Sequence, residues 1–407
     1  MPSLLPFSTF VLSLAALVTF SAAGDWPQFR GPNSSGVATD SRISDAPKIE
    51  WTAPLPGRGL SSPIVVGEKV FVTCSSGPKQ ERLHLICFSA ADGSKLWERQ
   101  LQATGRTMTF TKTCVASCTP CSDGEHVFAL WSSNDMAAFD LEGNLLWVRG
   151  LTADYPNASN SIGMASSPIV LGETVVAMIE NDSESYSLGL DTHTGRNLWK
   201  LDRPKAANWT SPVSWSAGAK SPPIALLQSS KGLLAVDPAS GSRLWEFAEG
   251  GSTMSSSVVS GNIVFTPSNG IVALSPHENN AAPEQLWHSK QINPSTISPV
   301  VLGGRLFSIN GAGVITAADV KTGEVKWKLR VTGPFSGSPV GAGDRLLVVN
   351  EKGLAQIVDI TAPEGAIVGS LQLPLNEETR ELVLCTPALE GDHIFVRSDS
   401  ALWRLGK

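Results

Sequence analysis

The fold is decided by a stretch that recurs along the chain, and its clearest copy is residues 189–200, Gly-Leu-Asp-Thr-His-Thr-Gly-Arg-Asn-Leu-Trp-Lys. An apolar run leads into Asp191, a turn closes at Gly195, and Trp199 follows four residues later. Two further copies keep this spacing of aspartate, glycine and tryptophan: Asp237, Gly241 and Trp245, then Asp319, Gly323 and Trp327. Looser copies end at Trp97, Trp147 and Trp287. Self-similarity at a fixed period indicates a repeat architecture.

Each repeat predicts four short antiparallel strands. In the first unit, Ser61-Ser62-Pro63 precedes an apolar run, and Gly67-Glu68 separates that run from a second one beginning at Lys69. Glycine beside a polar residue between apolar runs indicates a tight hairpin, because such turns need positive φ. Units of roughly forty to fifty residues with four strands are typical of propeller blades. A β-sandwich, the alternative, would not require the same pattern in every unit.

The number of units predicts a closed ring. Seven units fill residues 60–373, and residues 384–405 supply three more strands without a fourth. Residues 48–54 resemble an isolated fourth strand and include Trp51. Joining the two removes an open sheet edge. We therefore predict an all-β, eight-bladed β-propeller of four-stranded antiparallel blades over residues 48–407, closed by this N-terminal strand.

The N-terminal residues predict export. Residues 1–24 carry no charge and contain an apolar run over residues 10–20, followed by Ser21-Ala22-Ala23. Small residues at these positions are typical of signal peptidase sites. We predict a signal peptide over residues 1–23, an irregular lead-in over residues 24–47, and a periplasmic or secreted protein with no transmembrane segment after cleavage. A retained membrane anchor is the alternative, although the apolar run is short for a bilayer span.

Charge and cysteine content limit the partners and cofactors. The net charge of −6 argues against nucleic-acid binding, which needs a basic surplus. The six cysteines predict disulfides or buried thiols rather than a metal site, because no histidine stands at metal-binding spacing from the cluster Cys114, Cys118 and Cys121. Cys74 and Cys87 lie on successive strands of one predicted hairpin, and Cys385 is remote in sequence.

The repeated tryptophans are predicted to have a structural role, since each buries a large surface between neighbouring blades. The residues with this predicted blade-docking role are Trp51, Trp97, Trp147, Trp199, Trp245, Trp287 and Trp327. The seventh unit has Gly369 at the corresponding place. A poorly filled interface and fast hydrogen exchange are therefore expected in the fourth strand of that blade.

The copy that ends at Trp245, Ala-Val-Asp-Pro-Ala-Ser-Gly-Ser-Arg-Leu-Trp, resembles the tryptophan-docking repeat of the PQQ-like propeller superfamily. This superfamily includes the quinoprotein alcohol dehydrogenases and the BamB component of the outer-membrane β-barrel assembly machinery. Resemblance to the dehydrogenases implies pyrroloquinoline quinone (PQQ), calcium, a catalytic aspartate and a disulfide between adjacent cysteines. The chain has no adjacent cysteines, and no acidic residue can be matched individually to those roles. We therefore predict no catalytic residue, metal or cofactor.

Resemblance to BamB implies a non-catalytic scaffold that binds protein partners in the envelope. Gly24-Asp25 stands where a lipoprotein would have its cysteine, so lipidation is not predicted. The connections at residues 103–115, 155–163 and 205–209 differ most between units, and such loops usually carry binding function. The candidate binding residues are Arg58, Arg106, Asn160 and Trp209. We predict a monomeric exported scaffold that binds an envelope protein or cell-wall component at the channel mouth; the alternative is a PQQ-dependent dehydrogenase or other catalytic propeller.

Overall fold

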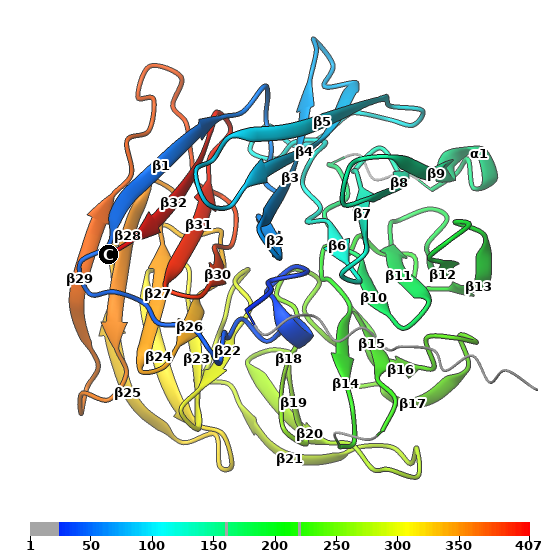
Figure 1. The fold of residues 1–407 in the computed structure, drawn as a ribbon. Coiled ribbons are helices and arrows are strands. Elements are labelled where there is room, and N and C mark those ends of the chain that lie inside the picture. Colours follow the sequence, from blue (N-terminus) through cyan, green and yellow to red (C-terminus); the bar gives the residue numbers. More distant parts are fainter. Residues whose placement is uncertain (1–23, 159–161, 219–220) are drawn as a thin grey trace, which may run out of the picture.

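The chain forms a ring of eight four-stranded antiparallel sheets (Figure 1). The computed structural model describes residues 24–158, 162–218 and 221–407. The first strand of each sheet lies nearest the centre of the ring, and the fourth strand lies at the rim. This arrangement confirms the predicted eight-bladed propeller.

The blades follow one another in chain order. Blade 1 contains β2 (Ile64–Val66), β3 (Lys69–Ser76), β4 (Arg82–Ser89) and β5 (Lys95–Gln102). Blade 2 contains β6 (Cys121–Ser122), β7 (His126–Leu130), β8 (Asp135–Asp140) and β9 (Leu145–Gly150), and the short helix α1 (Leu151–Asp154) follows it. Blade 3 contains β10 (Ile169–Leu171), β11 (Thr174–Ile179), β12 (Tyr186–Asp191) and β13 (Asn197–Asp202). Blade 4 contains β14 (Val213–Trp215), β15 (Ile224–Ser229), β16 (Gly232–Val236) and β17 (Arg243–Phe247).

The second half of the ring has the same construction. Blade 5 contains β18 (Val258–Ser260), β19 (Ile263–Pro267), β20 (Ile271–Ser275) and β21 (Glu284–Ser289). Blade 6 contains β22 (Val300–Leu302), β23 (Arg305–Ile309), β24 (Val314–Asp319) and β25 (Val325–Arg330). Blade 7 contains β26 (Val340–Ala342), β27 (Arg345–Val349), β28 (Leu354–Asp359) and β29 (Ala366–Gln372). Blade 8 contains β30 (Ala388–Glu390), β31 (His393–Arg397), β32 (Ala401–Gly406) and the N-terminal strand β1 (Lys48–Pro54).

Strand β1 closes the ring, as predicted. It runs antiparallel to β32, with Thr52 opposite Trp403 and Pro54 opposite Ala401. The indole N–H of Trp51 then donates to the carbonyl oxygen of Ala90 in blade 1 at 3.1 Å. The two ends of the propeller are therefore joined both within blade 8 and between blades 8 and 1.

The other tryptophans of the fourth strands also contact the following blade. Four of their indole N–H groups donate to backbone carbonyl oxygens there, in the pairs Trp97–Leu141, Trp147–Thr192, Trp199–Pro238 and Trp287–Val320. The indole rings pack against glycines with positive φ in the next blade, such as Gly195 against Trp147 and Gly241 against Trp199. In the described part of the chain, the indole nitrogens of Trp245 and Trp327 have no hydrogen-bond partner.

A closed ring of hydrogen bonds joins the eight first strands at the centre. Each blade contributes one serine or threonine whose hydroxyl oxygen accepts a backbone N–H from the preceding blade, at distances of 2.9–3.2 Å. The eight residues, called the hydroxyl ring below, are Ser62, Thr119, Ser167, Ser211, Ser256, Ser298, Ser338 and Thr386. Small side chains at these positions therefore allow the first strands to come close together.

The first part of the lead-in (residues 24–47) fills one end of the central channel. The backbone of Trp26 pairs with that of Val65, which lies further along the first strand than the hydroxyl ring. The 3₁₀ helix η1 (Pro32–Ser34) lies among the first strands in Figure 1. Trp26 and Arg30 are fully buried. The sequence marks this segment as irregular, but it gives no sign that the segment enters the channel.

The gap expected at Gly369 is occupied, which corrects the prediction of a poorly filled interface. Gly369 lies opposite Ile357, the register position that tryptophan holds in other blades. A Cβ atom at this glycine would overlap the carbonyl oxygen of Asp45. The Asp45 carboxylate forms a two-oxygen ion pair with Arg345 at 2.5 and 3.0 Å. The last residues of the lead-in thus lie against β29 where other blades have an indole.

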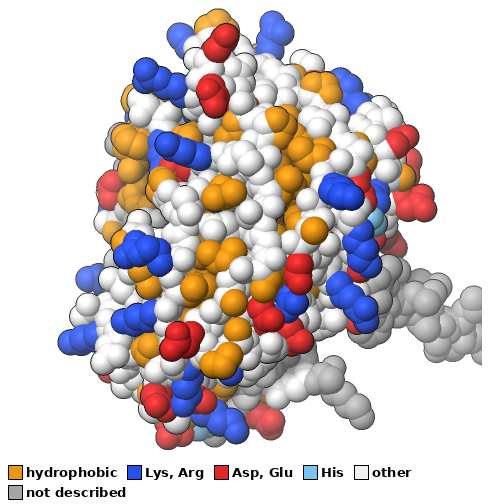
Figure 2. All heavy atoms as spheres, turned by 90° about the vertical axis from the view of Figure 1, so that its left-hand side faces the viewer, with side chains coloured by type: hydrophobic (Ala, Val, Ile, Leu, Met, Phe, Trp, Pro, Cys, Tyr) orange, Lys and Arg blue, Asp and Glu red, His pale blue; other side chains and the backbone are white. Residues whose placement is uncertain are grey.

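The outer edges of the blades carry exposed apolar side chains. Hydrophobic side chains stand between charged ones on the side of the ring that includes β1 and β29 (Figure 2). Ile367 and Val368 on β29 are partly exposed there, and Leu198 on β13 is 47% exposed. Apolar atoms make up more than half of the accessible surface of a folded protein, so exposed apolar residues at these edges do not by themselves mark a binding site.

All six cysteines are buried free thiols. Cys74 lies opposite His84 in the β3–β4 hairpin, whereas Cys87 lies opposite Phe71. The register therefore separates the two cysteines considered for a bridge. Burial raises the pKa of the Cys87 thiol to about 12.

Candidate functional site

A cavity of about 430 Å³ lies at the centre of the ring, on the face formed by the connections into the first strands. The hydroxyl ring lines its lower part, together with Phe29 from the lead-in. Because the lead-in fills the channel beyond Phe29, the cavity opens toward one face only. Its volume lies within the range of ligand-binding pockets, roughly 300–1,000 Å³.

The floor of the cavity combines polar and apolar surface. Each oxygen of the hydroxyl ring accepts one backbone N–H, so each hydroxyl hydrogen can donate to a ligand or to water. Phe29 contributes apolar surface to the floor. Arg30 beside it donates to the carbonyl oxygens of Ser257 and Pro299, so its guanidinium joins the lead-in to blades 5 and 6. Burial lowers the pKa of Arg30 to about 9.

The rim of the cavity is apolar and exposed. Four side chains that line the cavity near its opening are here called the apolar rim: Phe110, Ile162, Trp209 and Met254. The exposed fractions of Phe110, Ile162 and Met254 are 55%, 42% and 44%. The backbone N–H of Phe110 donates to the carbonyl oxygen of Ile162, which joins two of the long connections. Nearby Met108 is 61% exposed.

Two cations beside the mouth are paired with carboxylates. The ammonium group of Lys112 lies 2.6 Å from a carboxylate oxygen of Glu351, which also accepts a hydrogen bond from Ser336 at 2.7 Å. The Arg58 guanidinium lies 3.3 Å from a carboxylate oxygen of Asp399. Because each cation is already paired with a carboxylate, these two pairs provide little net charge to attract an ionic ligand.

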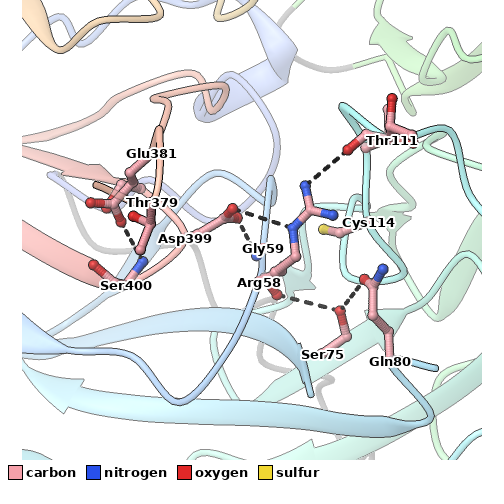
Figure 3. A network of polar contacts seen from close by, with 12 residues as sticks. Arg58, Gly59, Ser75, Gln80, Thr111, Cys114, Thr379, Glu381, Asp399 and Ser400 are labelled. Carbon is pink, nitrogen blue, oxygen red and sulfur yellow. Dashed lines mark hydrogen bonds and ion pairs between the residues drawn. The ribbon is translucent and has the colours of Figure 1, made fainter. Parts of the chain in front are cut away.

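Figure 3 shows how Arg58 connects three segments at the mouth. Its guanidinium reaches Asp399 in blade 8 and the carbonyl oxygen of Thr111 in the 103–115 connection. The carboxylate of Asp399 also accepts the backbone N–H of Gly59 at 3.1 Å. Arg58 therefore holds loops together beside the cavity and does not line it.

The other sequence candidates have different positions. Trp209 lines the cavity, and its indole N–H donates to the carbonyl oxygen of Gly163 at 2.9 Å. Arg106 is exposed on the 103–115 connection and does not line the cavity. Asn160 lies outside the described residues. The sequence analysis missed Phe110, Ile162 and Met254, although apolar residues within otherwise polar connections were a usable signal.

The cavity lining does not fit PQQ. This cofactor carries three carboxylate groups, which require cations or a metal for charge compensation. Lys112 is the only basic residue among the described lining residues, and it is paired with Glu351. The described residues also contain no cluster of three or more His, Cys, Asp or Glu side chains arranged for a metal ion.

The family model described as outer membrane protein assembly factor BamB matches residues 44–183, 157–281 and 268–403. These matches together span nearly the whole propeller. The chain belongs to the BamB-type family of PQQ-like propellers. No curated protein sequence matches this chain.

Solved structures with this fold include a BamB protein and two dehydrogenases. BamB from Moraxella catarrhalis is 14% identical, with a TM-score of 0.63, and the match covers 89% of this chain and 98% of BamB. Quinohemoprotein alcohol dehydrogenase from Comamonas testosteroni is 12% identical, with a TM-score of 0.70 and coverage of 95% and 81%. A europium-containing methanol dehydrogenase is 11% identical, with a TM-score of 0.69 and coverage of 95% and 98%. At these identities, the likeness concerns the fold.

None of the helices in the described ranges is long and apolar enough to cross a membrane.

Proposed function

We propose that this BamB-type propeller is a non-catalytic, exported scaffold that binds a protein of the cell envelope through the cavity mouth. The observation that carries this proposal is the apolar rim, three of whose four side chains stand exposed around a cavity that opens on one face only. Contiguous exposed apolar surface on a soluble domain marks an interaction site. As a monomer, the propeller would have one such site per molecule.

The chemistry of the mouth favours an uncharged apolar side chain as the anchor. The pairs Lys112–Glu351 and Arg58–Asp399 compensate charge within the protein. Met108, Phe110 and Met254 are all exposed, so a small molecule held inside the cavity would leave apolar surface uncovered. A protein partner can cover that surface and insert one side chain below it, and each large apolar side chain buried this way contributes about 1.5–3 kcal/mol.

Export fits this role, since an envelope partner is accessible only beyond the inner membrane. The support is the uncharged, apolar sequence of residues 1–23 and the envelope assignment carried by the family's description. Mass spectrometry of the protein from its native cells should detect a mature chain that begins near Gly24. An intact Met1 would contradict export with cleavage.

The proposal is tested with a photo-crosslinking amino acid at position 110, on the apolar rim. A matched variant carries it at position 198, where Leu198 is 47% exposed on the outer edge of β13. Irradiation of native cells should give a discrete protein adduct at position 110 and none at position 198. Equal labelling at both sites would overturn the proposal, and so would an adduct of cell-wall fragments alone.

The catalytic alternative has its own test. The purified protein is incubated with PQQ and calcium and then passed through gel filtration. We expect no quinone absorbance in the protein fraction, because the single lining lysine is already paired with Glu351. Stoichiometric retention of the quinone would favour an enzyme.

A further inference from the structure

Trp209 is held by its own hydrogen bonds and by the buried residue that precedes it, Asn208. Its backbone N–H donates to the carbonyl oxygen of Thr253 at 2.8 Å, and its indole N–H donates to Gly163. The preceding residue, Asn208, is buried, with 1% of its surface exposed. The orientation of Trp209 therefore depends on how Asn208 is fixed.

The side chain of Asn208 has a full set of hydrogen bonds. Its amide nitrogen donates to a carboxylate oxygen of Glu180 at 2.9 Å and to the carbonyl oxygen of Gln228 at 2.7 Å. Its amide oxygen accepts the backbone N–H and the hydroxyl of Thr210 at 3.2 and 2.9 Å. An asparagine amide can make four such bonds, and here all four are made.

Glu180 is itself fixed by a buried ion pair. Its other carboxylate oxygen lies 2.6 Å from Nε of Arg203, and the two side chains are only 1% and 5% exposed. Arg203 also donates to the carbonyl oxygen of Leu227 at 3.1 Å. A buried pair of this kind is costly to break, because the remaining charge is left unpaired.

The same network extends to the second residue of the rim. The amide nitrogen of Gln228 donates to the carbonyl oxygens of Ser252 and Ser255 at 2.7 and 2.8 Å. These two residues flank Met254, whose backbone N–H donates to the hydroxyl of Ser252. One buried polar network therefore supports both Trp209 and Met254, across blades 3, 4 and 5.

We propose that Glu180 is a positioning residue which, through Asn208, fixes Trp209 as a preformed wall of the cavity and so raises the affinity of the mouth for an apolar anchor. This inference rests on the proposed function, because it concerns the same mouth. A preformed wall lowers the conformational cost of binding. The buried Glu180–Arg203 pair makes this wall rigid, whereas the surface that contacts the partner is the apolar ring of Trp209.

The experiment follows the indole N–H signals of the full-length protein by NMR, with the Trp209 signal assigned from Trp209→Phe. The main variant is Asn208→Ala, which leaves the Glu180–Arg203 pair intact, and Glu180→Gln is the second variant. Glu98→Gln is the control, since Glu98 pairs with His84 and Lys95 in blade 1. We expect the Trp209 signal to shift or broaden in both network variants and to stay unchanged in the control.

Binding of the neutral aromatic dye Nile red gives the second measurement. Its Kd should rise about tenfold in Asn208→Ala, because Trp209 is then no longer a preformed wall. The Kd should stay unchanged in Glu98→Gln. An unchanged Trp209 signal in Glu180→Gln or in Asn208→Ala would overturn the inference, and so would a changed signal with an unchanged Kd. A changed signal and a raised Kd without any adduct at position 110 would leave the positioning role intact and reject the proposed function.

Discussion

The two ends of the central channel differ in whether their apolar side chains are buried or exposed. At the closed end, the lead-in buries Trp26 completely and places the guanidinium of Arg30 on backbone carbonyl oxygens. At the open end, Phe110 and Met254 stay about half exposed around a cavity. The difference indicates that the closed end serves stability, whereas the mouth keeps apolar surface available for a partner.

The largest effect is expected from removing the lead-in together with β1. Deletion of residues 24–54 leaves the edge of β32 unpaired and removes Trp51 from the interface with blade 1. We expect loss of cooperative thermal unfolding, measured by circular dichroism, because a ring without closure loses one interface between neighbouring blades. A shorter deletion of residues 24–40 retains β1 and serves as the comparison. Equal melting of the full-length and 24–54-deleted proteins would contradict the closing role.

Truncation of one tryptophan at each end compares the two ends directly. Trp26→Ala should lower the free energy of unfolding by about 3–5 kcal/mol, as for other fully buried aromatic side chains. Trp209→Ala should lower it by less than Trp26→Ala does, because Trp209 is only partly buried. Urea unfolding measures both values. Similar losses for the two variants would remove the distinction between a stabilising end and a binding end.

Because the lead-in packs against β29, adding a single methyl group at Gly369 should destabilise the protein. Gly369→Ala places its Cβ atom on the carbonyl oxygen of Asp45, so the lead-in must move. We expect a loss of about 1–3 kcal/mol in the free energy of unfolding, typical of overpacking. Gly218→Ala is the control, because a Cβ atom there meets nothing within 4 Å. If both variants unfold alike, the lead-in does not pack against β29.

The smallest effect concerns a carboxylate near the mouth. Burial raises the pKa of Glu381, but hydrogen bonds from Ser398, Ser400 and Asn376 outweigh it and leave the pKa below its ordinary value of 4.5. A depressed carboxylate pKa contributes stability above the unfolded-state value, and that contribution is lost as the pH falls through the folded-state pKa. The amide NMR signal of Ser400, which donates to Glu381 at 2.7 Å, should therefore titrate with a midpoint below pH 4.5. Glu381→Gln should abolish this titration, and a midpoint above 4.5 would contradict the assignment.

The sequence by itself determined the architecture. The repeat ending in Trp199 and its copies fixed the number of blades, and the isolated strand with Trp51 identified the closure. These features could be predicted because each blade is built from local hairpins, and the same local pattern is repeated along the chain. The place of Trp209 in a connection near the channel was predicted for the same reason, since the connections follow from the strands.

Only the tertiary structure decided how the non-repeating segments are used. Asp45 lies against Gly369 and pairs with Arg345, 300 residues away in sequence, and no repeat pattern predicts such a contact. Glu180 follows β11, whereas Arg203 and Asn208 lie in the connection after β13, so the three side chains meet only when blade 3 and this connection are folded. The physical reason is that hairpin turns and strand periodicity act between near neighbours in the chain. The filling of a shared channel and the pairing of buried charges depend on side chains that the completed ring brings together.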